Sequence, residues 1–199
     1  LSLQSSIDDA SIVVHPESFV NKTVDNPWGI STIKIGREGR KSWMEIERKF
    51  LVQKLPEEAP LGYTELEQGY ISTDPVIRIR LQKKGEEESF VLTIKGGGMV
   101  MREEYELALS RAQFEGLRPK CTGRIIAKRR YRYALPDGLV AEVDVFAGEQ
   151  QGLILAEVEF PDEQSMLRFE KPDWFGEDVS QDIRYHNSYM SIERRNGES

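Results

Sequence analysis

The stretch Met44-Glu45-Ile46-Glu47-Arg48-Lys49-Phe50-Leu51-Val52 alternates charged and apolar side chains. Successive side chains of a β-strand point to opposite faces. Glu45, Glu47 and Lys49 therefore share one face, and the intervening Ile46 lies on the other. The stretch predicts a strand that carries two anions and then a cation on the same side.

The same alternation recurs in other strand-like segments. Carboxylates lie two residues apart at Glu104/Glu106, Glu142/Asp144 and Glu157/Glu159, and cations lie in matching positions at Arg78/Arg80, Lys95 and Lys128/Arg130. The residues between them are mostly apolar. Charge of both signs on strand after strand indicates that it is gathered in one place for a charged ligand.

Strand signals follow one another closely from Met44 onward, at residues 44–52, 63–72, 76–84, 88–96, 101–109, 124–135, 138–147 and 152–160. Antiparallel strands in this number can close into a barrel without exposed edges. The predicted fold class is α+β, mainly antiparallel β: an eight-stranded closed tunnel-like barrel with a charged lumen, flanked by a few short helices.

Two orientations of the charged face are open. With the charges outward, the apolar residues would fill an ordinary barrel core. With the charges inward, about eight carboxylates and six cations would line the lumen, and helices would cover the apolar exterior. The apolar character of the intervening set and the Glu-x-Glu-x-Lys order favour the inward orientation.

Connections and helices have recognisable signals. Leu135-Pro136-Asp137-Gly138 predicts a turn, Lys83-Lys84-Gly85-Glu86 a hairpin connection, and Gly96-Gly97-Gly98 a flexible link. Short helices are predicted at residues 110–117 and 162–169, with Ser110 and Asp162 as caps, and at 187–195. Phe114 and Leu117 form the apolar stripe of the first, and Met166, Leu167 and Phe169 are expected to be buried by the second.

The bulk composition indicates one soluble domain. The 199 residues are 39% apolar and 31% charged, and no apolar run approaches the roughly 20 residues of a membrane-spanning helix. The lone Cys121 and the lack of a recognisable secretory signal favour the cytoplasm. A formal charge of −7 argues against a general nucleic-acid binder but allows one basic pocket. The sequence does not indicate an oligomeric state.

Three regions differ in character. Residues 1–43 contain His15 and several Gly and Pro signals, and they predict a loosely ordered N-terminal extension. Residues 44–190 carry the charged strands and predict the tunnel domain. Residues 191–199 are assigned as a C-terminal tail.

The charges also define the expected ligands. Enclosed like charges repel one another, and carboxylates take up protons, unless counter-ions complete the array. Carboxylate oxygens suit Mg²⁺ or Mn²⁺, whereas Arg and Lys suit phosphate oxygens. We therefore expect Mg²⁺ or Mn²⁺ as the cofactor and a small-molecule polyphosphate or triphosphate as the partner, with no nucleic acid and no membrane.

These motifs resemble the CYTH family, the triphosphate tunnel metalloenzymes. The resemblance begins with the 44–52 stretch and covers residues 44–190. It continues through Gln68-Gly69-Tyr70, Ile77-Arg78-Ile79-Arg80-Leu81, Thr93-Ile94-Lys95, Glu104-Tyr105-Glu106, Lys128-Arg129-Arg130-Tyr131, Glu142-Val143-Asp144-Val145-Phe146, Glu157-Val158-Glu159-Phe160, Trp174 to Val179 and Arg184-Tyr185. The opening stretch is most similar to the bacterial inorganic triphosphatase subgroup, which cleaves tripolyphosphate.

The resemblance implies a role for each charged position. Phosphate binding falls to Lys49, Arg78, Arg80, Lys95, Lys128, Arg130 and Arg184, and the implied catalytic residues are Lys49, Tyr70, Lys95 and Lys128. Metal binding falls to Glu45, Glu47, Asp144, Glu157 and Glu159, with Glu104, Glu106 and Glu142 binding the metal or its ligands.

Several alternatives stay open. Tyr70 is either a core aromatic or a residue near the attacking water. His186 is expected on the surface of the last helix, or else it stands where close relatives carry a substrate-contacting lysine. The predicted activity is metal-dependent hydrolysis of inorganic tripolyphosphate by in-line attack of water. The alternatives are nucleoside triphosphate hydrolysis, cyclisation of ATP as in class IV adenylate cyclases, and polyphosphate binding without turnover.

Overall fold

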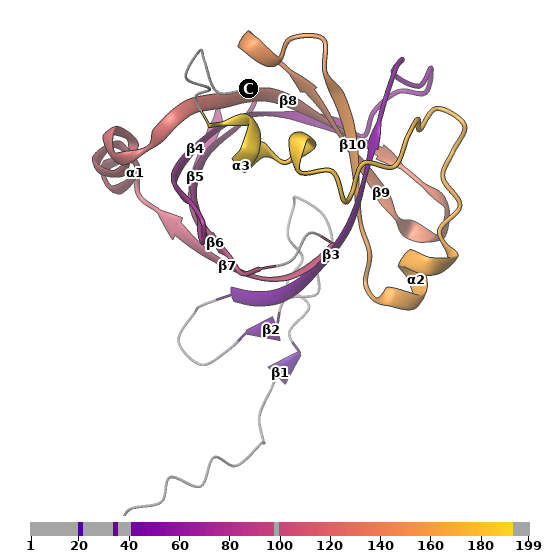
Figure 1. The fold of residues 1–199 in the computed structure, drawn as a ribbon, viewed down its shortest axis with the longest axis horizontal. Coiled ribbons are helices and arrows are strands. Elements are labelled where there is room, and N and C mark those ends of the chain that lie inside the picture. Colours follow the sequence, from indigo (N-terminus) through magenta and orange to yellow (C-terminus); the bar gives the residue numbers. More distant parts are fainter. Residues whose placement is uncertain (1–19, 22–33, 36–40, 98–99, 193–199) are drawn as a thin grey trace, which may run out of the picture.

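The computed structural model describes residues 20–21, 34–35, 41–97 and 100–192. Its strands form one antiparallel sheet in the order β1-β2-β3-β10-β9-β8-β4-β5-β6-β7, and β3 also pairs with β7. In Figure 1 the sheet is seen end-on and curls into a ring.

The predicted strands are confirmed, with ends that differ by a few residues. The ring consists of β3 (Lys41–Leu51), β4 (Gly62–Thr73), β5 (Val76–Lys84), β6 (Glu87–Lys95), β7 (Met101–Leu109), β8 (Thr122–Ala134), β9 (Val140–Phe146) and β10 (Ile154–Glu159). Two short strands, β1 (Val20–Asn21) and β2 (Lys34–Ile35), precede it. The helices are α1 (Arg111–Leu117), α2 (Glu163–Arg168) and α3 (Asn187–Met190), with 3₁₀ turns η1 (Arg118–Lys120), η2 (Pro136–Gly138), η3 (Gly148–Gln150) and η4 (Ile183–Tyr185).

The ring closes through β3, which divides its length between two neighbours. Its first part pairs with β7, ending at Ile46 opposite Met101. Its second part pairs with β10, from Glu47 opposite Glu159 to Leu51 opposite Leu155. Because the two registers do not overlap, the predicted closed barrel is slightly overstated. The sheet is a curled one that parts on either side of β3.

A segment near the C-terminus covers the edge that β3 leaves free. We call residues 176–180 the strap. Within it, Gly176 donates its backbone N–H to the Leu51 carbonyl (2.7 Å), and Leu51 donates to the Glu177 carbonyl (2.9 Å). Val179 donates to the Lys49 carbonyl (2.8 Å). The strap therefore satisfies backbone groups of β3 that β7 does not reach.

The main apolar clusters lie outside the ring, so the inward orientation of the charges is confirmed. Ile46, Phe50, Val143 and Val158 point outward and pack with the segment around α2. On the opposite side, Phe114 of α1 packs on Phe90, with ring centroids 5.0 Å apart.

The expectation that helices cover the whole apolar exterior is wrong for one part of it. Ile94, Tyr105 and Leu107 on the outer face of β6 and β7 are 41%, 42% and 51% exposed. Among the described helices, α1 packs at one end of these strands. The described helices leave these three side chains exposed.

Local signals are confirmed at both predicted caps. Ser110 forms a capping box with Gln113, and Asp162 accepts from the Ser165 N–H (2.7 Å). Leu167 was expected to be buried but is 73% exposed. The short helix α2 turns this side chain away from the sheet. The turn at η2 has positive φ at Asp137 as well as at Gly138 (58° and 74°).

The boundaries of the expected regions lie largely outside the described residues. Most of the predicted extension 1–43 and most of the tail 191–199 belong to this part of the chain, so both assignments stay predictions. Helix α3 ends at Met190, earlier than the predicted residue 195, which is itself not described. Among the described helices, none has the length and apolar composition to cross a membrane.

Candidate functional site

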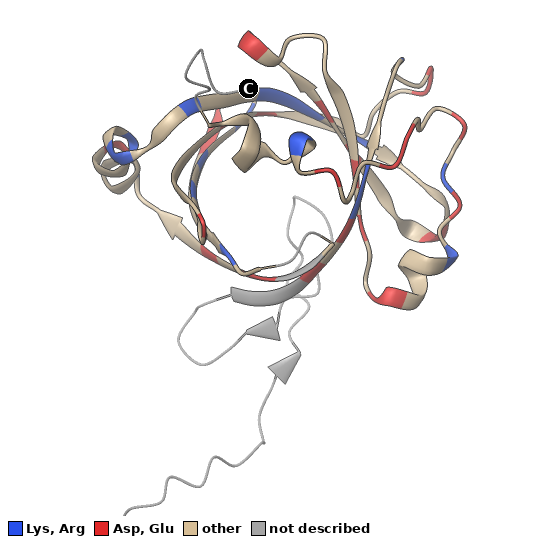
Figure 2. Cartoon of the chain, viewed as in Figure 1, with Lys and Arg blue, Asp and Glu red and all other residues tan. Residues whose placement is uncertain are grey.

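The strand register places the charged side chains opposite one another inside the ring. Lys49 lies opposite Glu157 between β3 and β10, and Asp144 opposite Arg130 between β9 and β8. Across the ring, Lys95 lies opposite Glu104 between β6 and β7. Figure 2 shows these Lys, Arg, Asp and Glu positions around the ring. The alternation in the sequence thus becomes a charged lumen.

One half of the lumen, made by β3, β10, β9 and β8, is a buried network of ion pairs. Asp144 and Lys128 have fully buried side chains and pair with each other. Arg130 binds Asp144 through Nε (2.7 Å) and Nη2 (2.6 Å), and it also pairs with Glu142 and Glu157. Lys49 pairs with Glu157 (2.8 Å). We call this set the β8–β10 network.

The other half is made by β5, β6 and β7 with the start of β3. Arg80 Nη2 donates to Glu106 (3.0 Å), and Arg78 lies 3.7 Å from Glu104. Lys95 joins Glu104 (2.6 Å) to Glu45 (2.8 Å). All these charged side chains face the lumen, so the cations of one half lie across the lumen from the cations of the other half.

The β8–β10 network shifts the pKa values of both Glu157 and Lys128. Burial acts to raise the pKa of Glu157, but Lys49, Arg130 and Lys128 outweigh it and hold that pKa well below its usual range. Burial lowers the pKa of Lys128 to about 8. Glu157 is thus a fixed anion, whereas Lys128 can exchange a proton near neutral pH.

A third group of carboxylates, Glu45, Glu47 and Glu159, lies close together, and the pKa values of Glu47 and Glu159 are raised. Burial first, and then Glu45, raises the pKa of Glu47. Glu159 lies opposite Glu47. Its pKa is raised to about 7 by loss of bulk solvent and by Glu45, Glu142, Glu47 and Glu104, although its side chain keeps an exposed surface in the lumen. Burial and then the neighbouring carboxylates therefore favour the protonated forms of Glu47 and Glu159.

This acidic group, Glu45, Glu47 and Glu159, fits a divalent cation. Carboxylate oxygens are the ligands that Mg²⁺ and similar hard ions prefer. A bound cation would take the place of the protons that the raised pKa values favour on Glu47 and Glu159. Among the described residues, no three Asp, Glu, His or Cys side chains are already arranged around a metal position. The assignment of metal ligands therefore stays a prediction supported by the donor set.

One end of the lumen is closed by apolar side chains. Tyr70, Ile126, Phe146 and Leu155 are buried there together with Val179, and Tyr185 and Met190 pack against them. In Figure 1, η4 and α3 lie across this end of the ring. Tyr70 is 2% exposed, and burial raises its pKa, although the charge of Arg78 and then a hydrogen bond from Arg78 offset part of this shift. Tyr70 is thus a core aromatic that also touches a lumen cation.

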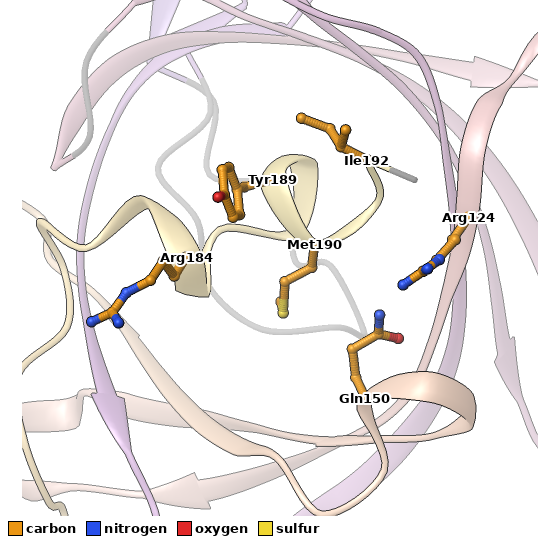
Figure 3. A pocket seen from close by; sticks show the side chains of 6 residues that line it. All are labelled: Arg124, Gln150, Arg184, Tyr189, Met190 and Ile192. Carbon is orange, nitrogen blue, oxygen red and sulfur yellow. The ribbon is translucent and has the colours of Figure 1, made fainter. Parts of the chain in front are cut away.

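Arg184 is the predicted phosphate-binding residue that the structure does not bring to the charged lumen. Its exposed side chain pairs with Asp182, and it lines a cavity of about 180 Å³ with Arg124, Gln150, Tyr189, Met190 and Ile192 (Figure 3). The cavity is lined from β8, η3, η4, α3 and the residues just after α3, and none of the lumen carboxylates lines it.

The surface position expected for His186 is wrong. Its side chain is 9% exposed, and Nε2 lies 3.3 Å from the Ser180 carbonyl oxygen. The His186 imidazole packs against the strap because η4 turns the chain back before α3 begins.

Three lumen residues were given no site role from the sequence. Thr93 bridges Arg78 (2.9 Å) and Glu106 (3.4 Å), Gln68 is 1% exposed beside Tyr70, and Arg132 follows Lys128 and Arg130 on the same face of β8. Two are neutral and gave no charge signal. The parity of Arg132 with Lys128 and Arg130 is a signal that could have found it.

Comparison with known proteins gives consistent matches. The chain matches the CYTH domain over residues 44–188. It is 44% identical to the inorganic triphosphatase of Nitrosomonas europaea over 149 residues, which cover 74% of this chain and 97% of that protein. It is 39% identical to the inorganic triphosphatase of Acetivibrio thermocellus over 152 residues, 73% of this chain and 92% of that protein.

A solved structure agrees with these matches. A crystal structure of an inorganic triphosphatase, 41% identical to this chain, superposes with a TM-score of 0.54 and covers 75% of this chain and 95% of that one. The shared fold includes the strands that carry the lumen charges, because the matched region coincides with them.

Proposed function

Because the chain belongs to the CYTH family, we propose that it hydrolyses inorganic tripolyphosphate and releases phosphate, with a divalent metal as cofactor. The observation that carries the proposal is the lumen itself, where cations from both halves of the ring lie beside the acidic group Glu45, Glu47 and Glu159. A polyanion accompanied by a metal matches both kinds of charge. We further propose Mg²⁺ or Mn²⁺ as the metal and the cytoplasm as the location.

The cations would bind the phosphate chain. Arg78, Arg80 and Arg130 present planar guanidinium groups that match phosphate oxygens bidentately, while Lys49 and Lys95 provide compact charges. A side-chain nitrogen of each of these cations lies within 3.7 Å of a carboxylate oxygen. Each cation is therefore held in place before substrate binds. Such preorganised charges stabilise the negative charge that develops during phosphoryl transfer.

The acidic group would hold the metal. A bound divalent ion would supply Lewis-acid chemistry for the hydrolysis. Glu45, Glu47 and Glu159 would supply its oxygen ligands, and Glu104 and Glu106 would fix the cations beside it. Lys128, with a pKa of about 8, is placed to give or take a proton near neutral pH. Tyr70 would hold Arg78 toward the substrate through their hydrogen bond.

A phosphate-release panel tests this proposal. Tripolyphosphate, pyrophosphate, ATP and thiamine triphosphate are each incubated with Mg²⁺ or Mn²⁺, and products are identified. We expect tripolyphosphate to be cleaved fastest. Formation of cAMP from ATP would instead establish a cyclase, and tight binding of tripolyphosphate without phosphate release would establish a binding module.

Two variants test the acidic group. Glu47→Gln and Glu159→Gln remove one negative charge each while preserving shape, so turnover should fall by about 100-fold or more. Glu65→Gln is the matched control, because Glu65 lies on the outer face of β4 and pairs with Arg129 (2.7 Å). Unchanged phosphate release in both lumen variants would refute the assignment.

A further inference from the structure

A second cavity lies at the end of the lumen opposite the apolar closure. Its lining comes from the start of β4 (Thr64), the end of β5 (Gln82 and Lys84) and the later part of β8 (Arg130 and Arg132), and its volume is about 120 Å³. On the same strands, Tyr70, Val76 and Ile126 lie at the closed end. The cavity is therefore at the open mouth of the lumen.

Arg132 differs from the other cations of the lumen. Lys49, Arg78, Arg80, Lys95, Lys128 and Arg130 each pair with a carboxylate. Within the described ranges Arg132 has no ion pair, and its buried Nε has no hydrogen-bond partner. Glu142 lies opposite Arg132 in the register of β8 and β9 but pairs with Arg130. A partly buried guanidinium with an unsatisfied Nε is a position that an anion would stabilise.

The neighbours of Arg132 are also donors. When the Gln82 amide is oriented with its oxygen toward Arg80, that oxygen accepts from Arg80 Nη2 (2.8 Å) and Nε (2.7 Å), and the NH₂ group is the part that can donate to a ligand. Lys84 adds a cation to the lining. Glu142 is the one carboxylate in the lining, and Arg130 pairs with it. The balance of the cavity is therefore cationic.

The position of the cavity relates it to the substrate. Lys128, Arg130 and Arg132 are successive inward residues of β8, about 7 Å apart along the strand. A phosphate chain held among the buried cations would point its far end toward Arg132. Only a chain with further phosphoryl groups would extend into the mouth.

We propose that Arg132, Lys84 and Gln82 form an outer anion subsite that binds the terminal phosphoryl group of linear polyphosphates longer than three groups. The inference rests on the proposed function for the orientation of the chain. It extends that function by naming the residues that would favour longer substrates.

Calorimetry in EDTA tests the subsite without turnover. The affinities of tripolyphosphate and linear tetrapolyphosphate are measured for the wild type, Arg132→Ala and the control Arg129→Ala. Arg129 is the outward neighbour on β8 and pairs with Glu65. We expect Arg132→Ala to weaken tetrapolyphosphate binding about tenfold and tripolyphosphate binding less than about twofold, as for loss of one charged hydrogen-bonding group.

A second variant guards against a folding defect in the first. Lys84→Ala, at an exposed position, should weaken tetrapolyphosphate binding in the same direction, by about threefold, which is less than for the buried guanidinium. Equal losses for both phosphates, or no loss in either variant, would overturn the inference. A larger loss for ATP than for tetrapolyphosphate would also overturn it, because the cavity would then accept a nucleoside. If the wild type binds both phosphates but hydrolyses neither, the proposed function fails while the subsite comparison still stands.

Discussion

Glu159 lies near four other carboxylates in the lumen. Its pKa is about 7 in the folded protein against an ordinary value of 4.5. Between these pH values the folded state binds a proton that the unfolded chain does not, so the contribution of Glu159 to stability falls as pH rises through this interval. Above about pH 7 its carboxylate repels Glu45, Glu142 and Glu47.

We therefore expect Glu159→Gln to raise the melting temperature of the metal-free protein at pH 8. The gain should be about 1–3 °C, because solvent screens this partly exposed group and about 1 kcal/mol corresponds to 2–4 °C in a chain of this size. The gain should shrink toward zero by about pH 4.5. Calorimetric scans in EDTA measure it, with Glu65→Gln as the surface control. A variant that is less stable than the wild type at pH 8 would contradict the repulsion.

The same side chains show how far sequence reasoning reaches for single residues. Parity along a strand assigns Glu45, Asp144 and Arg130 to one face correctly, because strand geometry fixes which way a side chain points. It does not reveal partners. Thr93 and Gln68 are neutral and give no charge signal. The burial of His186 depends on the strap, which is far from β3 in the sequence although it lies beside it in space.

The strap couples the C-terminal segment to the strand that carries Lys49. Ser180 Oγ accepts the Lys49 backbone N–H at 2.8 Å in a buried contact, and Asp178 accepts from Arg48 Nε (2.9 Å) and Nη2 (2.6 Å). These contacts hold β3 at the point where β7 no longer pairs with it. The strap thereby fixes the backbone from which Lys49 reaches Glu157.

Ser180→Ala should leave the Lys49 N–H buried without an acceptor. We expect a loss of about 1–3 kcal/mol in the free energy of unfolding, the usual cost of such a group. We also expect a several-fold rise in KM for tripolyphosphate because Lys49 is displaced. Urea unfolding and steady-state kinetics measure the two effects.

Ser180→Thr is the matched control, since it keeps the hydroxyl acceptor and should restore both quantities most of the way. A Ser180→Ala protein with normal stability and normal KM would show that the strap does not position β3.

Elements were predictable to different degrees for a physical reason. The strands and the caps at Ser110 and Asp162 depend on local alternation and local hydrogen bonds, which the sequence displays directly. The pairing of β3 with β7 joins residues more than fifty positions apart, and its contacts with β10 and the strap join residues more than a hundred positions apart. No local pattern specifies such pairings, so the predicted closed barrel was slightly too regular.

The lumen as a whole is a set of ion pairs that substitute for absent ligands. Lys49 and Arg130 hold Glu157, while Arg80 holds Glu106. Exchanging these internal pairs for a phosphate chain and a metal costs the protein little, because each cation keeps an anionic partner throughout. Ligand binding should therefore appear directly as added stability.

We expect tripolyphosphate together with a divalent metal to raise the melting temperature by about 5–10 °C at roughly 100 times its dissociation constant. Such saturation adds about 2.7 kcal/mol, and 1 kcal/mol corresponds to about 2–4 °C for this chain length. A non-hydrolysing ion such as Ca²⁺ keeps the complex intact during the scan if Mg²⁺ supports turnover. The Glu47→Gln and Glu159→Gln double variant should respond to tripolyphosphate alone as the wild type does but lose the extra stabilisation from the metal, because its cations are intact and its acidic group is not. An equal metal-dependent gain in both proteins would place the metal outside the acidic group.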